Sequence, residues 1–124
     1  AALLDMELHN LTDTDNLNVV AFEKETMDKL GLIPEIASRY RATYFSHIIG
    51  GYAAGYYSYL WAEVLDTDAF EAFKEHGVFD KNTADSFRKN ILEKGGTEDP
   101  MTLYRGFRGA DPSLEPLLKN RGLK

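Results

Sequence analysis

The segment His47-Ile-Ile-Gly-Gly-Tyr52-Ala-Ala-Gly-Tyr56-Tyr57-Ser-Tyr59-Leu-Trp61 decides how this chain folds and what chemistry it can offer. A tyrosine has a large apolar ring and a hydroxyl that needs a partner when buried, so such clusters line either a core or a wet cleft. On a helix, Tyr52, Tyr56 and Tyr59 stand at i, i+4 and i+7 and share one face. Tyr57 points well away from that line. The spacing therefore predicts a helical face that carries three phenols.

A histidine and a glycine pair precede these tyrosines. Gly50 and Gly51 permit backbone angles that other residues avoid, and they leave room for a substrate backbone to approach. A histidine and several phenols around a flexible turn can hydrogen-bond a peptide and stabilise negative charge on a carbonyl oxygen. This chemistry suggests acyl transfer or peptide hydrolysis. Pattern alone, however, favours plain packing, with the glycines as helix caps and His47 as a core residue without a ligand role.

Glycines, prolines and aspartates divide the rest of the chain into helical segments, and no strand-like alternation competes with them. We expect helices over residues 19–30, 34–45, 53–65, from Asp66 or Thr67 to about 76, 83–94, 99–107 and 111–122. Apolar residues recur at helix-compatible intervals and are predicted to pack between these helices, namely Leu60, Val64, Phe70, Phe73, Phe87, Ile91, Leu92, Leu103 and Phe107. Trp61 is expected to be a buried scaffold residue.

Composition indicates one modest core, because 44% of the 124 residues are hydrophobic and 27% are charged. We therefore expect an all-α fold in which residues 1–124 form a single helical unit. The net charge of −6 and the scattered Lys and Arg residues argue against a nucleic-acid partner. No apolar run approaches the roughly 20 residues that span a bilayer, so no membrane partner is expected. The absence of cysteine excludes disulfides and thiolate metal sites.

Several motifs, taken in order, resemble the C-terminal region of a family of zinc peptidases that includes thimet oligopeptidase, oligopeptidase A and dipeptidyl carboxypeptidase. The resemblance covers essentially the whole chain. Upstream, the stretch from Leu4-Asp5-Met6 to Arg39-Tyr40-Arg41 is most similar to the bacterial dipeptidyl carboxypeptidase branch. The other motifs are Phe45-Ser46-His47, residues 50–65, Asp68-Ala69-Phe70, Gly95-Gly96, Asp99-Pro100-Met101, Leu103-Tyr104, Phe107-Arg108-Gly109 and Arg121-Gly122-Leu123.

The resemblance implies a compact, multi-helix C-terminal portion of a larger helical metallopeptidase, one that hydrolyses oligopeptides and releases C-terminal dipeptides. It assigns two catalytic residues, with Tyr59 donating a hydrogen bond to the oxyanion and His47 contacting the substrate or intermediate. It also assigns four substrate-binding residues, Tyr52 and Tyr56 in the cleft and Gly50 and Gly51 as the hinge of a closing loop.

Peptidases of this family bind zinc through His-Glu-x-x-His on one helix and a glutamate on a later one, and that motif does not occur here. The three histidines, His9, His47 and His76, lack the spacing of such a ligand pair. We therefore expect zinc in the full-length enzyme, no metal bound by these residues, and no activity of this fragment alone. The remainder of the same polypeptide is the expected partner besides the oligopeptide substrate, with self-association of the fragment through exposed surface and a cytoplasmic location.

Two alternatives stay open at this stage. The tyrosine face could belong to a free-standing, non-catalytic helical module that binds a peptide or protein groove. It could also belong to a structural cap whose motif residues only pack. The presence of metal ligands upstream of Ala1 in the same polypeptide would separate the peptidase from both.

Overall fold

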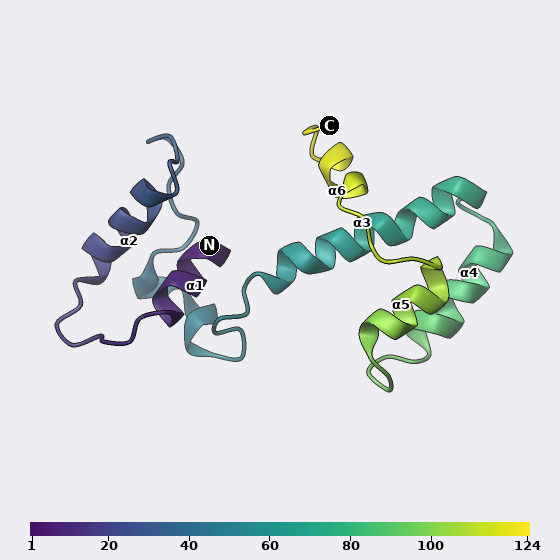
Figure 1. Cartoon of the computed structure of the whole chain (residues 1–124), viewed down its shortest axis with the longest axis horizontal. Coiled ribbons are helices and arrows are strands. Elements are labelled where there is room, and N and C mark those ends of the chain that lie inside the picture. Colours follow the sequence, from purple (N-terminus) through teal and green to yellow (C-terminus); the bar gives the residue numbers. More distant parts are fainter. The chain divides into compact units, whose positions relative to one another are not determined.

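The computed structural model describes residues 1–124 as helices and turns, without a β-strand (Figure 1). The predicted all-α fold is therefore confirmed. The chain divides into two compact units, an N-terminal unit Ala1–Tyr59 and a C-terminal unit Leu60–Lys124. That residues 1–124 act as a single helical unit of a longer catalytic domain stays a prediction. None of the helices is both long enough and apolar enough to cross a membrane.

The N-terminal unit is built from two helices and two short 3₁₀ turns, α1 Ala2–His9, α2 Val19–Lys29, η1 Ala42–Tyr44 and η2 Ser46–Ile49. Helix α1 packs against α2, and α2 packs against η1. The α2 helix begins where predicted, because the Asn18 side chain accepts a hydrogen bond from the Ala21 amide at 3.1 Å. Leu4 and Phe45 are completely buried at the centre of this unit. Helix α1 has no side-chain cap at Ala1 and was not predicted.

The helix predicted over residues 34–45 is wrong, since this segment forms turns that lead into η1. Its backbone is held by the buried side chain of Glu23 on α2. The Glu23 carboxylate accepts a hydrogen bond from the Ala42 amide at 3.2 Å and forms an ion pair with Arg41, which is extended. Glu23 thus binds one backbone amide of the segment, and turn hydrogen bonds bind the amides of Ile36 and Tyr44 in place of the predicted helical ladder.

A single helix, α3 Ser58–His76, replaces the two helices predicted over residues 53–76. It begins five residues later than expected because residues 50–57 form turns. Thr67 does not interrupt it, since the Thr67 hydroxyl donates a hydrogen bond to the Glu63 carbonyl at 2.8 Å and remains inside the helix.

The C-terminal unit continues with α4 Lys81–Phe87, a π-helical turn η3 Arg88–Leu92, α5 Pro100–Arg108 and α6 Glu115–Asn120. Two aspartates start helices by accepting backbone amides, Asp80 from Thr83 at 2.7 Å and Asp99 from Thr102 at 2.9 Å. The helices predicted over residues 83–94 and 99–107 are thus confirmed within two residues at each end. The last helix begins later than the predicted position 111, at Glu115.

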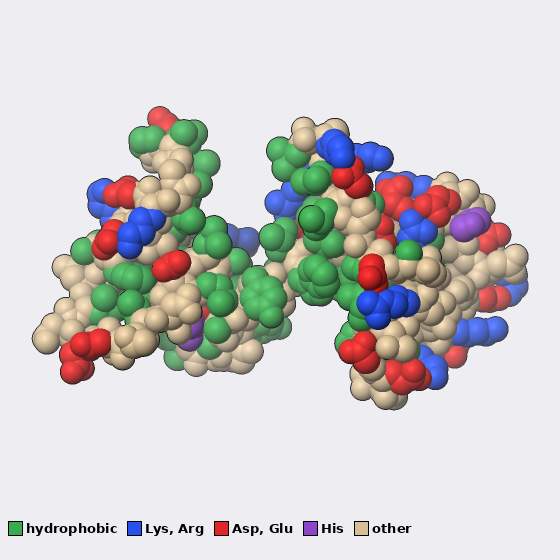
Figure 2. All heavy atoms as spheres, in the orientation of Figure 1, with side chains coloured by type: hydrophobic (Ala, Val, Ile, Leu, Met, Phe, Trp, Pro, Cys, Tyr) green, Lys and Arg blue, Asp and Glu red, His purple; other side chains and the backbone are tan.

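The predicted core of the C-terminal unit is only partly buried. Val64 and Leu103 are buried, and the rings of Phe73, Phe87 and Phe107 lie 5.1–6.3 Å apart by their centroids. Trp61, expected to be buried, is 47% exposed. Hydrophobic side chains reach the visible surface of both units (Figure 2), and the large ones in the C-terminal unit include Leu60, Phe70, Phe79 and Leu92.

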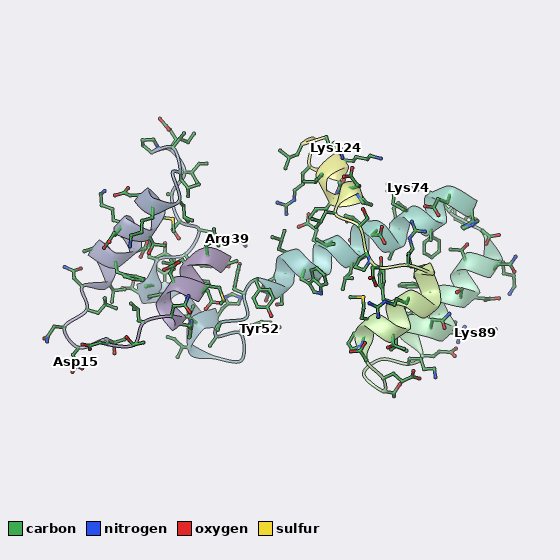
Figure 3. All side chains as sticks on the ribbon, in the orientation of Figure 1. Asp15, Arg39, Tyr52, Lys74, Lys89 and Lys124 are labelled. Atoms are coloured by element: carbon green, nitrogen blue, oxygen red, sulfur yellow. The ribbon has the colours of Figure 1, made fainter.

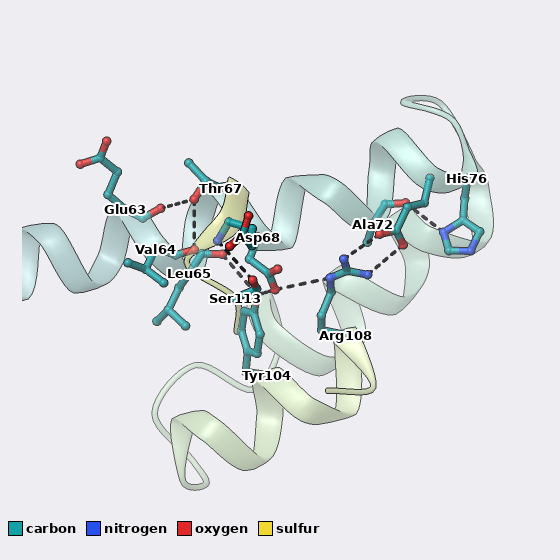
Figure 4. A network of polar contacts seen from close by, with 12 residues as sticks. Glu63, Val64, Leu65, Thr67, Asp68, Ala72, His76, Tyr104, Arg108 and Ser113 are labelled. Carbon is teal, nitrogen blue, oxygen red and sulfur yellow. Dashed lines mark hydrogen bonds and ion pairs between the residues drawn. The ribbon is translucent and has the colours of Figure 1, made fainter. Parts of the chain in front are cut away.

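A buried polar network joins α5 to α3 in this unit. Figure 4 shows Tyr104 and Arg108 converging from α5 on Asp68, which is buried on α3. The Tyr104 hydroxyl donates a hydrogen bond to the Asp68 carboxylate at 2.5 Å, and Arg108 Nε lies 3.5 Å from the same carboxylate. Arg108 also donates two hydrogen bonds to Glu75, at 2.9 and 2.8 Å. Burial raises the pKa of the Tyr104 phenol, and the hydrogen bond to Asp68 and the charge of that carboxylate raise it further.

Tyr104→Phe should lower the free energy of unfolding by about 1–3 kcal/mol at neutral pH, because it removes the closest donor to a buried carboxylate. Urea unfolding measures this loss. Tyr44→Phe is the matched control, since the Tyr44 side chain is exposed, and it should change the free energy of unfolding by less than about 0.5 kcal/mol.

The raised pKa of Tyr104 predicts that the stability difference between the wild type and Tyr104→Phe depends on pH. The folded state holds the phenol proton more tightly than the unfolded state, whose pKa is about 10. The resulting stabilisation is complete below about pH 10 and is lost as the pH rises from there through the raised pKa. The stability of the wild type should therefore fall more steeply above about pH 10 than that of Tyr104→Phe. Parallel curves would contradict the assigned hydrogen bond.

Candidate substrate-binding site

Four predicted site residues meet in the N-terminal unit and form what we call the aromatic cluster, His47, Tyr52, Tyr56 and Tyr59. The His47 ring centroid lies 5.0 Å from that of Tyr56, 5.8 Å from that of Tyr52 and 6.1 Å from that of Tyr59. Tyr52 stacks on Tyr59 at 5.6 Å, and Tyr56 lies 5.0 Å from Tyr59. The sequence therefore selected residues that the fold brings together.

The reason given for this grouping, a shared helical face, is wrong. Residues 50–57 form consecutive turns, and of the three tyrosines only Tyr59 lies on α3. The Gly55 amide donates a hydrogen bond to the Tyr52 carbonyl at 2.9 Å, and the Ser58 amide donates one to the Gly55 carbonyl at 3.0 Å. Ala54 has a left-handed backbone with φ 53°. The chain reverses here, so that turns and not helical periodicity bring Tyr52 back over Tyr59.

Neither predicted hinge glycine uses a conformation reserved for glycine. Gly50 is extended, with φ −120° and ψ −154°, and the positive-φ glycines lie at positions 31, 77, 95, 109 and 122. A methyl group at Gly50 would come no closer than 3.9 Å to the Ser46 carbonyl oxygen, and one at Gly51 would meet nothing within 4 Å. The residue in this loop that needs a left-handed backbone is Ala54.

Two members of the cluster are exposed to solvent and two are half-buried. Tyr52 is 50% exposed and Tyr59 is 48% exposed, and Figure 3 shows Tyr52 on the loop that leads into α3. Tyr56 and His47 are half-buried, and His47 Nδ1 is buried without a hydrogen-bond partner in the protein. Tyr57 is exposed and stays outside the cluster, as predicted. Two phenols are thus available to a ligand, while the other two rings support them.

The surroundings of two phenols favour their neutral form. Loss of solvent raises the pKa of Tyr59, and the contact with the Tyr52 side chain raises it further. Loss of solvent also raises the pKa of Tyr56, followed by the contact with the Tyr40 side chain. Since an unperturbed tyrosine already has a pKa near 10, both hydroxyls remain protonated at neutral pH. They can therefore donate hydrogen bonds to a carbonyl oxygen.

Three residues that support the cluster were assigned no role from the sequence. Phe45 is fully buried, and Tyr40 stacks on it at 4.9 Å and lies 6.0 Å from Tyr56. The Asp5 carboxylate is also fully buried and accepts hydrogen bonds from the Ala54 amide at 3.0 Å and the Tyr56 amide at 2.9 Å. The signal for Asp5 was a charged residue inside the apolar opening of the chain. No local signal revealed which backbone it binds.

Comparison with known proteins places this sequence in a family. The model of Peptidase family M3 matches residues 1–123. The chain belongs to peptidase family M3. This confirms the resemblance that the motifs indicated.

Several curated relatives are named as peptidases. The chain is 42% identical to oligopeptidase A of Haemophilus influenzae over 123 residues, which cover 98% of the chain and 18% of that relative. It is 44% identical to dipeptidyl carboxypeptidase of Escherichia coli over 130 aligned positions, covering 99% of the chain and 18% of that relative. Oligopeptidase A of Escherichia coli is 57% identical over 81 residues, 64% of the chain and 12% of that relative. The chain therefore spans less than a fifth of the length of these relatives.

Family M3 peptidases are in general zinc metallopeptidases, but the residues of this chain do not fit a zinc site. No group of three or more His, Asp or Glu side chains is placed to hold a metal ion. The side chain of His9 faces Asp5 alone, His47 lies among aromatic rings, and His76 Nδ1 lies 2.9 Å from the Ala72 carbonyl oxygen.

Ala54→Gly should leave the free energy of unfolding unchanged or raise it by up to about 1 kcal/mol, because glycine adopts a positive φ without the steric cost of an L side chain. Ala53→Gly is the control, since Ala53 lacks a positive φ and the substitution only adds freedom to the unfolded chain. It should lose about 0.4–1 kcal/mol in the same urea titration. Equal losses in both variants would contradict the left-handed turn.

Proposed function

We propose that this chain forms one wall of the active site of a family M3 peptidase that hydrolyses oligopeptides. The observation that supports this most directly is the aromatic cluster, in which the rings of three tyrosines lie within 6.1 Å of the His47 ring by their centroids. A peptide substrate offers a row of carbonyl oxygens, and neutral phenols are matched donors for them. The activity, the substrates and the partners of the longer protein are part of the proposal.

Tyr59 is the proposed catalytic donor. It lies in the first turn of α3, which fixes its backbone, and its side chain is half-exposed. A donor aimed in advance at the oxygen on which charge develops lowers the barrier because it need not reorganise during the reaction. The raised pKa keeps its proton in place at neutral pH. Its hydroxyl would bind the carbonyl oxygen more strongly as that oxygen becomes an anion.

The other members of the cluster are proposed to hold the substrate. Tyr52 is exposed beside Tyr59 and would bind the peptide backbone. His47 would contact the substrate or the intermediate from η2. Tyr56 is half-buried, with its ring centroid 5.0 Å from those of His47 and Tyr59, and would bind substrate or support both of them. We retain Gly50 and Gly51 as the proposed hinge of this loop.

The metal ligands of the enzyme are proposed to lie outside residues 1–124, in the remainder of the same polypeptide. Zinc would supply the activated water of such peptidases when bound there. This chain alone is then expected to be inactive, and the rest of the polypeptide is its proposed partner. Self-association of the isolated chain stays a prediction.

We also propose that the full enzyme releases C-terminal dipeptides and that it is cytoplasmic. The first is supported by the relative named dipeptidyl carboxypeptidase, whereas relatives named oligopeptidase A are equally similar. The second is supported by an Arabidopsis thaliana relative named probable cytosolic oligopeptidase A, although another from that plant is named organellar.

Tyr59→Phe in the full polypeptide that contains this chain should lower kcat by about 100-fold and leave KM within a few fold, because the lost hydrogen bond forms mainly in the transition state. Steady-state hydrolysis of a short fluorogenic oligopeptide measures both constants. Tyr57→Phe is the matched control, since its phenol is adjacent in sequence, exposed and outside the cluster.

The same pair of variants separates the peptidase from a binding module. If Tyr59→Phe raised KM with kcat unchanged, the phenol would bind peptide without stabilising the transition state. If neither constant changed, the catalytic role of Tyr59 would be wrong.

Gly51→Ala should lower turnover by at least several fold without changing the unfolding midpoint. The structure leaves open space for the added methyl group and does not require a positive φ, so any loss reports restricted movement of the loop. Gly96→Ala is the control, because Gly96 also lacks a positive φ and has no neighbour near its added methyl. Unchanged turnover in Gly51→Ala would remove the hinge from the mechanism.

A further inference from the structure

Asp5 makes the longest-range polar contacts with the loop that carries the aromatic cluster. It lies on α1, and its residue is 0% exposed. Its Oδ1 accepts a hydrogen bond from the Ala54 amide at 3.0 Å, and its Oδ2 accepts one from the Tyr56 amide at 2.9 Å. The two oxygens thus bind the two amides that flank Gly55, across 49 and 51 residues of sequence. We call this pair of hydrogen bonds the clasp.

Each oxygen of the buried Asp5 carboxylate accepts one backbone amide of the turn. Hydrogen bonds to an ionised acceptor are stronger than those between neutral groups. The His9 ring adds a third partner, since His9 Nδ1 lies 3.0 Å from Asp5 Oδ1 and 2.8 Å from the Asp5 carbonyl oxygen. A carboxylate without solvent needs such partners, so this one is tied to its present position.

The turn bound by Asp5 also contains a backbone conformation that alanine rarely adopts. Ala54, the first bound residue, has φ 53°, and Tyr56, the second, begins the approach to α3. A left-handed alanine persists only where its surroundings hold it. The carboxylate supplies that hold, because it fixes the amides on both sides of Gly55.

Tyr56 connects the clasp to the site. Its amide is bound by Asp5, and its ring lies 5.0 Å from both His47 and Tyr59 by centroids. A shift of the Tyr56 backbone therefore moves a ring that packs on both proposed catalytic residues. Without the carboxylate, both amides would lose their partners inside the fold, and the turn would gain freedom to move.

We propose that Asp5 is a positioning residue that fixes the aromatic cluster for catalysis through the amides of Ala54 and Tyr56. It touches no substrate and acts only through the loop. The inference rests on the proposed function of the cluster, although the clasp itself can be tested without any activity.

The first test is structural and compares Asp5→Asn with Glu7→Gln in the full polypeptide. Both substitutions replace one carboxylate by an amide on α1, but Glu7 is exposed and Asp5 is buried. Hydrogen exchange resolved to single residues should accelerate about tenfold or more at Ala54 and Tyr56 in Asp5→Asn, and stay unchanged in Glu7→Gln. Unchanged exchange at both amides in Asp5→Asn would overturn the proposal.

The second test asks whether the clasp acts through Tyr59. Asp5→Asn should lower kcat more than it raises KM, and its effect should be smaller in a Tyr59→Phe background, because the donor it positions is already gone. Fully independent effects of the two substitutions would overturn the positioning role. Tyr104→Phe is the control for simple loss of stability, since it weakens the C-terminal unit and leaves the cluster intact.

The two tests distinguish failure of this inference from failure of the proposed function. If Tyr59→Phe itself leaves kcat unchanged, the proposed function is wrong, and accelerated exchange in Asp5→Asn still establishes the clasp. If Asp5→Asn does not fold, hydrogen exchange of the wild-type protein tests the two hydrogen bonds to the Asp5 carboxylate. The Ala54 and Tyr56 amides should then exchange more slowly than the Tyr52 and Tyr57 amides, for which the structure gives no acceptor. Equal rates would overturn the clasp.

Discussion

The carboxylate of Asp5 is the contact on which the arrangement of the N-terminal unit depends. It brings the first helix of the chain to a turn some fifty residues later, and both of its oxygens bind backbone amides of that turn. Because the contact is made to backbone and not to side chains, it constrains the path of the loop whatever side chains the loop carries. The rings of His47, Tyr52, Tyr56 and Tyr59 then pack around a backbone that is already fixed.

The C-terminal unit also contains a buried aspartate, which side chains alone bind. Asp68 is buried on α3, and its partners come from Tyr104 and Arg108 on α5. Arg108 extends the contact to Glu75, two helical turns along α3. In each unit a buried aspartate thus ties together elements distant in sequence, with backbone donors in one unit and side-chain donors in the other. Buried carboxylates of this kind need complete sets of partners, which makes each arrangement specific.

The sequence predicted the residues of the site better than it predicted their geometry. Three helix starts were correct within two residues, where the side chains of Asn18, Asp80 and Asp99 cap their own first turns. The start predicted at position 111 was wrong, because α6 begins at Glu115 without a side-chain cap. The segment over residues 34–45 failed because its structure depends on Glu23, which lies on another element. The grouping of Tyr52 with Tyr59 was right for a wrong reason, since it arises from a left-handed turn at Ala54 that no spacing rule anticipates. In the sequence, Asp5 was distinguished only as a charged residue next to apolar ones.

The neutral phenols of the cluster have a consequence for which peptides this wall can accept. With their pKa values raised, Tyr56 and Tyr59 carry no charge anywhere in the physiological range. The exposed phenols of Tyr52 and Tyr59 would offer ring faces and hydroxyl dipoles to a peptide bound as proposed. As the proposed wall of a peptide site, such a surface would recognise the backbone that every peptide shares, whether the neighbouring side chains are acidic or basic. Breadth of substrate choice would then be a property of this wall, and any preference for particular side chains would have to be imposed from elsewhere.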